Sequence, residues 1–258
     1  MRCDLFLAEK GYAKSRSKAR ELIEAGAVRI NGKKIEKPSE SVDETVDNRV
    51  EILMESPFVG RGGLKLEHAL DCFGISVEGL LALDVGASTG GFTDCLLKRG
   101  AANVIAVDSG EGQLDPSLCE DSRVINIEKY NARYIKAEDL SFLPDIAVMD
   151  VSFISQTLIL PALSQVMKEG ATLVSLIKPQ FEVGRGAIGK KGIVKNAKDR
   201  RNAVTDVIAC AASYGLGCVA LTRSPIRGGD GNIEFLAAFR KGEPCLVDKS
   251  VIQRVAEV

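Results

Sequence analysis

The sequence predicts an α/β protein in which a doubly wound, mostly parallel sheet follows a small N-terminal α+β domain. From residue 80 onward, short apolar runs alternate with helical patterns, which is the order of elements in a parallel sheet covered by helices. The first 55 residues instead resemble two short helices and a hairpin. Because a glycine-rich loop joins the last two strands, the final strand is expected to be antiparallel. The seven expected strands are 80–84, 103–108, 124–127, 145–150, 171–177, 217–222 and 233–239.

The N-terminal domain is defined by helix and turn signals. Helices are expected over residues 2–10 and about 16–25, and Gly26 ends the second one, since glycine is common just after a helix C-terminus. Asn31-Gly32 then separates two short strands, which is a strong signal for a type I′ hairpin. Residues 1–37 carry ten Lys and Arg against five Asp and Glu. This excess suits phosphate contacts, and a solvated charged surface is the alternative.

Composition and charge exclude several classes of protein. The net charge of the 258 residues is −1, so attraction to nucleic acid has to come from local patches. No apolar run approaches the roughly 18 residues of a membrane span, and the N-terminus lacks the apolar region of a signal peptide. The seven cysteines form no C-x-x-C pair, which indicates reduced thiols in a cytoplasmic protein. With His68 as the single histidine, neither a metal site nor a Ser-His-Asp triad is expected.

The stretch from Leu80 to Asp108 forms one βαβ unit. Its first strand ends in Asp84 and a turn with Gly86 and Gly90, and glycine permits unusual backbone angles and the close approach of a ligand. Its second strand ends in Asp108, where an acidic residue can accept both ribose hydroxyls of an adenosine-type cofactor. The spacing matches neither G-x-G-x-x-G nor a phosphate loop. The unit therefore predicts a nucleoside site, with an ordinary glycine turn as the alternative.

Four charged residues fall at the expected carboxyl edge of the sheet or at its approaches. Lys65 lies on a helix expected over about 61–73, Asp150 and Lys178 end the fourth and fifth strands, and Glu234 starts the last. A lysine at the end of an apolar strand is costly unless it is paired, and a structural salt bridge would explain one such lysine. Two lysines and two acids at one edge favour catalysis, because a lysine can steer a hydroxyl oxygen and help remove its proton.

The N-terminal residues as a group resemble the S4 RNA-binding module. The matching residues are Leu5-Phe-Leu-x-x-x-Gly11-x-x-x-Ser15-Arg-Ser-x-Ala19, then Ile23-x-x-Gly26-x-Val28-x-Ile30-Asn31-Gly32, then Lys37-Pro38. This resemblance implies that a basic face contacts RNA. The residues expected on that face are Lys14, Arg16, Arg20, Arg29, Lys33 and Lys34.

The order Lys-Asp-Lys-Glu resembles the tetrad of FtsJ-type ribose 2′-O-methyltransferases, and residues 1–242 are similar to the TlyA-type haemolysin/rRNA methyltransferase family. The resemblance implies a Rossmann-like, seven-stranded S-adenosylmethionine (SAM)-dependent methyltransferase domain at 61–245, after an S4-like domain at 1–55 and a linker at 56–60, with a C-terminal tail at 246–258. Its marks are Arg61-Gly-Gly-x-Lys65-Leu, Asp84-Val-Gly-Ala-Ser-Thr-Gly-Gly-Phe92, Asp150-Val-Ser-Phe-Ile-Ser155, Leu176-Ile-Lys-Pro-Gln-Phe-Glu182 and Gly228-Gly-x-Gly-Asn-x-Glu234-Phe.

The same resemblance implies site residues and a cofactor. Lys65, Asp150, Lys178 and Glu234 would be the catalytic residues, and SAM the cofactor, with no metal required. The residues expected at the cofactor are Asp84, Gly86, Ser88, Thr89, Gly90, Asp108, Glu128 and Asn131.

The substrate implied by the resemblance is cytidine in ribosomal RNA. Members with short ends act on the large-subunit RNA, and this chain begins at the S4 motif, so the large subunit is the expected partner. A basic segment at 184–201, with Arg185, Lys190 and Lys191, is expected to hold RNA phosphates. Two alternatives stay open: an S4-type ribosome-binding factor without catalysis, and a membrane-active haemolysin, which the lack of a strongly apolar amphipathic helix disfavours.

Overall fold

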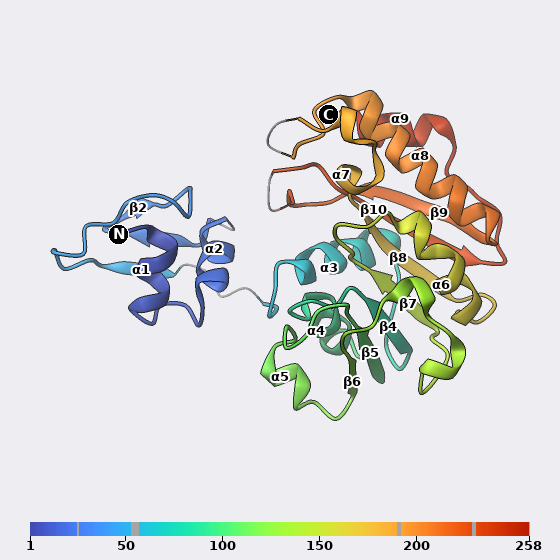
Figure 1. The fold of residues 1–258 in the computed structure, drawn as a ribbon, viewed down its shortest axis with the longest axis horizontal. Helices are drawn as coiled ribbons and strands as arrows, with labels where there is room; N and C mark the ends of the chain where they lie inside the picture. The colour runs from blue at the N-terminus through green and yellow to red at the C-terminus, as the bar shows by residue number, and fades with distance from the viewer. Residues whose placement is uncertain (25, 53–56, 190–191, 229–230, 258) are drawn as a thin grey trace. The chain divides into compact units, whose positions relative to one another are not determined.

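The computed structural model describes residues 1–24, 26–52, 57–189, 192–228 and 231–257, apart from the side chain of Arg185. The chain divides into two compact units, Met1–Arg61 and Gly62–Val258 (Figure 1). Ser56, the first residue of the expected linker, lies outside the described residues. Each unit has its own apolar core.

The first unit contains the expected helices and hairpin. Its elements are α1 (Cys3–Glu9), α2 (Arg16–Glu24), β1 (Val28–Ile30), β2 (Lys33–Lys34) and β3 (Val50–Ile52). The strands pair antiparallel in the order β2-β1-β3, and β3 is a strand that the sequence pattern did not predict. Asn31 and Gly32 have φ of 53° and 78°. Both residues of the turn are thus left-handed, as a type I′ hairpin requires.

The second unit is a sheet flanked by helices. Its helices are α3 (Gly62–Phe73), α4 (Gly91–Lys98), α5 (Pro116–Cys119), α6 (Leu160–Val166), α7 (Pro179–Glu182), α8 (Ala197–Ser213) and α9 (Lys249–Ala256), with 3-10 turns η1 (Ala132–Tyr134), η2 (Ala137–Asp139), η3 (Gln156–Leu158) and η4 (Arg185–Ala187). Its strands are β4 (Leu81–Val85), β5 (Asn103–Val107), β6 (Val124–Ile127), β7 (Ile146–Met149), β8 (Thr172–Ile177), β9 (Leu216–Arg223) and β10 (Phe235–Lys241). All seven expected strands are confirmed.

The strand order indicates the edge of the sheet at which a ligand would bind. The order is β6-β5-β4-β7-β8-β10-β9, and β10 runs antiparallel to both of its neighbours, which confirms the expected antiparallel last strand. The chain leaves β4 toward β5 and β6 and then returns to the other side of β4 for β7. In such sheets ligands bind beyond the carboxyl ends of the strands where the order reverses, here between β4 and β7.

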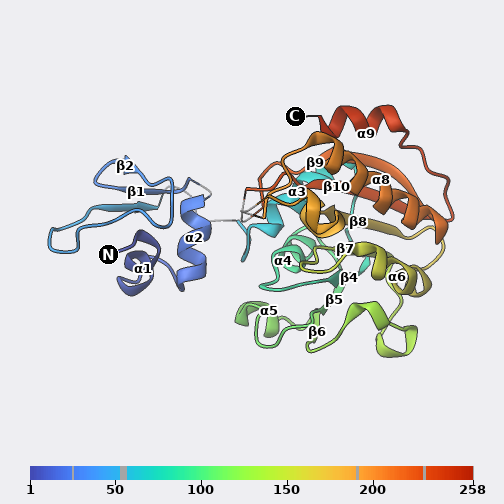
Figure 2. The ribbon, with the colours of Figure 1, turned by 45° about the horizontal axis from the view of Figure 1, so that its top comes forward.

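Helices cover both faces of the sheet, and alternation along the strands decides which side chain meets which helix. Leu83 and Val85 of β4 belong to the core shared with α6, α8 and α9. Asp84 lies between them, so its side chain points to the opposite face and bonds Thr93 of α4. α3 and α4 contact each other, and both lie apart from α6 and α8 in Figure 1, while Figure 2 shows the sheet and its helices from a second direction.

Residues 246–258 are more than the expected tail, because they contain α9. Ile252 and Ala256 of this helix are buried in the core of the second unit, and α9 contacts α8 and β9. Arg200 Nη2 donates to the backbone oxygen of Ala256 (3.2 Å), and Arg201 pairs with Glu257 (3.2 Å). The second unit of the structure therefore includes α9, whose apolar face packs on its core.

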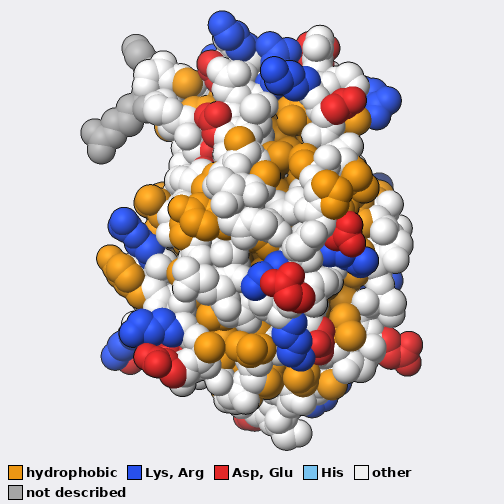
Figure 3. All heavy atoms as spheres, turned by 90° about the vertical axis from the view of Figure 1, so that its right-hand side faces the viewer, with side chains coloured by type: hydrophobic (Ala, Val, Ile, Leu, Met, Phe, Trp, Pro, Cys, Tyr) orange, Lys and Arg blue, Asp and Glu red, His pale blue; other side chains and the backbone are white. Residues whose placement is uncertain are grey.

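The face shown in Figure 3 carries both signs of charge, interspersed with hydrophobic and uncharged side chains. This matches the small net charge of the whole chain. Within the part of the chain that the structure describes, no helix is long and apolar enough to cross a membrane.

Candidate active site

The turn after β4 brings the backbone close to the carboxyl ends of two neighbouring strands. Gly86 has φ of 84°, and a Cβ placed on it would lie 2.7 Å from the backbone oxygen of Asp150. Only glycine fits this position without strain. Gly90 has φ of 92° and caps the N-terminus of α4, where a Cβ would collide with Leu118. The fold itself therefore requires glycine at both positions.

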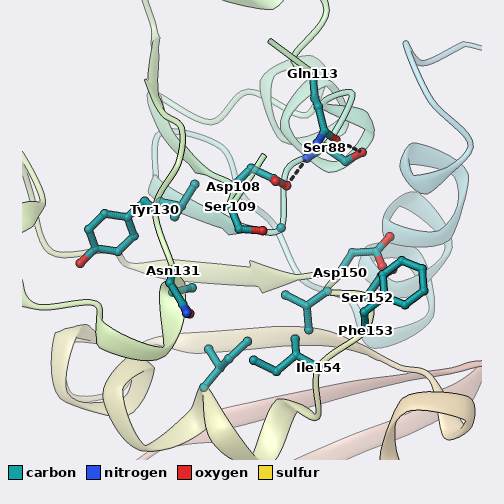
Figure 4. A pocket seen from close by; sticks show the side chains of 15 residues that line it. Ser88, Asp108, Ser109, Gln113, Tyr130, Asn131, Asp150, Ser152, Phe153 and Ile154 are labelled. Atoms are coloured by element: carbon teal, nitrogen blue, oxygen red, sulfur yellow. Dashed lines mark hydrogen bonds between the residues drawn. The ribbon is translucent and has the colours of Figure 1, made fainter. Parts of the chain in front are cut away.

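Asp108 follows β5 and organises the same turn. Its carboxylate accepts hydrogen bonds from the backbone nitrogens of Ser88 (2.8 Å) and Gly110 (2.7 Å). The Ser88 hydroxyl donates to Gln113 Oε1 (3.2 Å), and Figure 4 shows both contacts of Ser88. A carboxylate has about four acceptor positions, so Asp108 keeps capacity for the hydroxyls of a ribose.

A pocket of about 560 Å³ lies beyond this edge of the sheet. In Figure 4, Tyr130 and Asn131 lie across the pocket from Asp150, Ser152 and Phe153. The volume is in the range of small-molecule sites. The lining residues are Gly86, Ser88, Val107, Asp108, Ser109, Gln113, Tyr130, Asn131, Ala132, Asp150, Val151, Ser152, Phe153, Ile154 and Ile159.

Four of the residues expected at the cofactor do not line this pocket. Thr89 is exposed outside the lining, and Gly90 lies beneath the turn. The Glu128 carboxylate accepts from the backbone nitrogen of Gly112 (2.8 Å), and hydrogen bonds from that nitrogen and from Asn126 lower the pKa of Glu128. Asp84 is fully buried and accepts from the Thr93 hydroxyl (2.7 Å).

Asp84 is instead a buried residue that links β4 to α4 beneath the site. Burial raises the pKa of Asp84 to about 7, and the nearby negative charge of Asp150 acts in the same direction. At neutral pH this carboxyl group is therefore partly protonated. Its place in the βαβ unit was predicted correctly, but strand alternation turns its side chain toward α4 and away from the pocket.

The four predicted catalytic residues form two ion pairs. Lys178 Nζ lies 2.6 Å from Asp150 Oδ1, and Lys65 Nζ lies 2.6 Å from Glu234 Oε2. The Lys65 and Glu234 side chains are only 9% and 2% exposed. We call Lys65, Asp150, Lys178 and Glu234 the ion-pair cluster. Two positive and two negative charges offset each other, which is what makes their burial tolerable.

The fold brings the two pairs to one edge of the sheet. Phe235 pairs with Ile177 across β10 and β8, so Glu234 is a strand neighbour of Lys178. A Cβ on Gly62, at the start of the helix that carries Lys65, would lie 3.7 Å from Asp150 Oδ2. β10 begins at the edge where the parallel strands end because it runs antiparallel.

Two polar residues that the sequence reasoning missed join the cluster. Lys178 Nζ also donates to the Ser152 hydroxyl (2.8 Å), and Gln180 Nε2 donates to Glu234 Oε1 (3.3 Å). Both residues stand within the motifs around Asp150 and Lys178. Their nearness to charged residues in the sequence was a usable signal, but only the structure shows which way they point.

An aromatic pair stands beside the cluster. Phe153 has φ of 64° and is 92% exposed, although it lines the pocket. Its ring centroid lies 5.2 Å from that of Phe181, and Lys178 Nζ lies 5.9 Å from the centre of the Phe181 ring. A large aromatic side chain held in a left-handed conformation and exposed at a pocket is uncommon and points to a function there.

The expected RNA-binding residues of the first unit have exposed side chains, but they are not equivalent. Arg16 Nε lies 3.0 Å from Asp4, whose carboxylate is buried and also binds Arg2. Hydrogen bonds from Arg2 and Arg16 lower the pKa of Asp4 to about 2. Lys33 pairs with Glu40 (3.1 Å). The remaining members, Lys14, Arg20, Arg29 and Lys34, are exposed.

The basic segment at 184–201 is described only in part. Lys190 and Lys191 and the side chain of Arg185 lie outside the described residues. Asn232, which is 1% exposed, connects the middle of this segment to the loop before Glu234. Its side chain accepts from the backbone nitrogen of Val194 (3.0 Å) and donates to the backbone oxygen of Gly192 (2.9 Å).

Comparisons with known proteins agree with this division of the chain. Residues 58–241 match the family model of FtsJ-like methyltransferases, and residues 1–47 match that of the S4 domain. Over 239 residues the chain is 44% identical to the 16S/23S rRNA (cytidine-2′-O)-methyltransferase TlyA of Mycobacterium tuberculosis, with 93% of this chain and 89% of that protein covered.

Two further matches extend the comparison. The chain is 33% identical over 261 residues to the 23S rRNA (cytidine-2′-O)-methyltransferase TlyA of Campylobacter jejuni, with 93% of this chain and 100% of that protein covered. A solved structure of a presumed hemolysin from Streptococcus thermophilus is 42% identical, with a TM-score of 0.80 and coverage of 99% of this chain and 94% of that one.

Proposed function

This chain belongs to the FtsJ-like methyltransferase family in its TlyA-type form, and from that premise we propose that it transfers a methyl group from SAM to the 2′-hydroxyl of a cytidine in ribosomal RNA. The observation that carries the proposal is the Asp150–Lys178 pair beside a pocket of nucleoside size. A ribose hydroxyl is a weak nucleophile, and this pair supplies the charged groups that its activation needs.

The residues present fit SAM. The carboxylate of Asp108 lies where it can accept ribose hydroxyls, and Gly86 lines the same side of the pocket. Asn131 and Tyr130 line the opposite side of the pocket and suit the base. The bound cofactor would supply a methyl group on a positively charged sulfur. The site residues that support this proposal are Gly86, Ser88, Asp108, Gln113, Tyr130 and Asn131.

Lys178 is the residue that we assign to the hydroxyl group of the RNA. Asp150 and the Ser152 hydroxyl occupy two directions around its ammonium group, and an ammonium has three donors. The remaining N–H can donate to the 2′-oxygen and orient it toward the methyl group. Stabilising the negative charge that develops on this oxygen favours transfer of its proton to the Asp150 carboxylate as the oxygen takes the methyl group.

Lys65 and Glu234 act as the second pair of the cluster. Both side chains are almost completely buried, so solvent water has little access to them. Gln180 bonds Glu234 and follows Lys178 closely in the sequence, so this pair holds the end of β8 from the side of β10. We assign Lys65 and Glu234 to the orientation of Lys178 and to the electrostatic balance of the site.

The RNA would be held by both units. Sequence-specific RNA recognition often splays a base out and stacks it on an aromatic side chain, and enzymes that modify a nucleotide within RNA commonly extrude it. Phe153, exposed beside Asp150, offers such a surface. In the first unit, the exposed basic residues suit phosphate contacts.

Arg20 gives a clean test of the first unit, because it is exposed and forms no ion pair like that of Arg16 with the buried Asp4 among the described residues. We expect Arg20→Ala, combined with Lys14→Ala, to lower RNA affinity. The slope of log K against log salt should become shallower by about 0.7–0.9 for each phosphate that is no longer neutralised. Filter binding between low and moderate salt would measure this slope. An unchanged slope would remove these two residues from the RNA interface.

Large-subunit RNA is the substrate that we propose. The names of the mycobacterial and Campylobacter relatives both include 23S rRNA, and only the first also includes 16S. The experiment uses purified protein, methyl-labelled SAM and separated, unmodified ribosomal subunits, with Lys178→Ala as the control. Nuclease digestion then assigns the label to ribose or base.

Label on a cytidine ribose of the large subunit, absent with Lys178→Ala, is the expected result. Label on a base would contradict the assigned chemistry, and label on the small subunit alone would contradict the assigned substrate. SAM binding without transfer to either subunit would favour a ribosome-binding factor without catalysis.

A further inference from the structure

The loop that carries Asp150 is attached to the helix that follows Lys178. Residues 150–155 connect β7 to η3, and α7 begins directly after Lys178. Asp150 and Lys178 thus follow neighbouring parallel strands, but the pairing between β7 and β8 stops at Met149 and Ser175. Beyond that point, other contacts have to set the distance between the two side chains.

Glu182, the last residue of α7, provides the first of these contacts. Its Oε2 accepts from the Ser155 hydroxyl (2.5 Å), and its Oε1 accepts from the backbone nitrogen of Gln156 (3.0 Å). The carboxylate is largely withdrawn from solvent, and burial raises the pKa of Glu182. A buried carboxylate is costly unless it is hydrogen-bonded, so these contacts explain its presence at this position.

Gln156 extends the attachment to the strand itself. Its side chain is 1% exposed, its Nε2 donates to the backbone oxygen of Leu176 (2.6 Å), and its Oε1 accepts from the Ser175 hydroxyl (2.7 Å). The loop is therefore bound to the last residues of β8 and to α7 at once. Phe153 and Phe181 add a ring contact between the same two segments.

Neither Glu182 nor Ser155 lines the pocket, and the Glu182 carboxylate is engaged by Ser155 and Gln156. From these contacts we infer that Glu182 is a positioning residue, which fixes the Asp150 loop against α7 and thereby holds the Asp150 carboxylate on the Lys178 ammonium. The inference rests on the proposed function for its catalytic consequence. A displacement of about 1 Å at reacting groups can lower a rate by about 100-fold.

The first test measures methyl transfer and SAM affinity with four variants. Glu182→Ala removes both acceptors, and we expect kcat to fall by about 10- to 100-fold while the Kd for SAM changes only a few-fold. Glu182→Gln should retain most activity, because the amide oxygen can accept from Gln156 and the amide nitrogen can donate to Ser155. Adding Ser155→Ala to Glu182→Ala should lower kcat little further, because Glu182→Ala has already removed the Ser155–Glu182 hydrogen bond. Glu120→Ala, an exposed carboxylate on the same unit, is the matched control.

Three results would overturn the inference. Wild-type kcat per folded molecule in Glu182→Ala, with only a lower Tm, would reduce Glu182 to a stabilising residue. A Glu182→Gln variant as slow as Glu182→Ala would show that the charge matters and not the hydrogen bonds. A raised KM for RNA at unchanged kcat would place Glu182 in substrate binding.

A crystal structure of Glu182→Ala tests the same inference without any activity. We expect the Asp150–Lys178 contact, 2.6 Å in this structure, to lengthen or break. An unchanged contact would contradict the positioning role even if the wild-type protein methylated no RNA. Inactive wild-type protein would count against the proposed function alone, so the two failures remain distinguishable.

Discussion

The candidate site has two ends, a nucleoside end in the pocket and the ion-pair cluster beside it, and they are built in different ways. The nucleoside end, around Gly86, Ser88 and Asp108, depends on backbone groups and positive φ angles within one βαβ unit. The ion-pair cluster depends on side chains from elements far apart in the chain, and Lys65 and Glu234 are separated by 169 positions. A turn geometry is largely local, whereas a buried ion pair exists only once the sheet has assembled. Substitutions at the two ends should therefore fail in different ways.

The largest effect is expected at Lys178. Lys178→Ala removes the ammonium that we propose to bind the 2′-oxygen, and methyl transfer should fall by about 100- to 10,000-fold. SAM affinity, which depends on the other end, should stay within a few-fold. Single-turnover kinetics and calorimetric SAM titration would measure the two. A large loss of SAM affinity would mean that the ends are not separate and that Lys178 belongs to the cofactor site.

The buried Lys65–Glu234 pair should respond mainly in stability. Lys65→Met leaves Glu234 buried without its partner, which should cost about 3–5 kcal/mol of unfolding free energy. The double variant Lys65→Met/Glu234→Gln should recover much of this stability but not the activity. Urea unfolding of the three proteins checks the prediction. A double variant that recovers activity as well would show that this pair is structural only.

A smaller effect is expected at Gly86, where the backbone carries the site. Gly86→Ala forces a side chain into a left-handed conformation and against the Asp150 backbone, which should cost about 1–3 kcal/mol and weaken SAM binding. Gly112→Ala is the matched control, since Gly112 also has positive φ but open space around its Cβ position. Equal SAM affinities in the two variants would show that close packing at Gly86 is irrelevant to the cofactor.

The last prediction concerns the pH dependence of stability that Asp84, buried beneath the site, should produce. The pKa of Asp84 rises from 3.8 to about 7 on folding, so the folded state binds the extra proton. Its stabilising contribution is complete below pH 4 and is lost as pH rises through 7, with a slope of at most about 1.4 kcal/mol per pH unit. Asp84→Asn should flatten this slope in urea unfolding between pH 5 and pH 8. An equally steep slope in the variant would assign it to other groups.

Much of the site could be predicted because strand ends are visible in the sequence. Asp108, Asp150 and Lys178 each follow an apolar run, and parallel strands place such residues at one edge. The hairpin at Asn31-Gly32 was equally predictable, since few residues tolerate two left-handed angles in succession. β3 was not, because its three residues carry no pattern of their own and pair with β1 only after the chain has folded back.

The sequence by itself determined the fold class, the family and the identity of the charged residues, because periodicity and glycine spacing act over short distances. Tertiary structure alone decided how these residues are used. It paired Lys178 with Asp150 and Lys65 with Glu234, turned Asp84 away from the pocket, and packed α9 onto the core. It also bound Glu182 to the Asp150 loop. The physical reason is that burial and hydrogen-bond partners depend on which segments meet in space, and no local pattern records that.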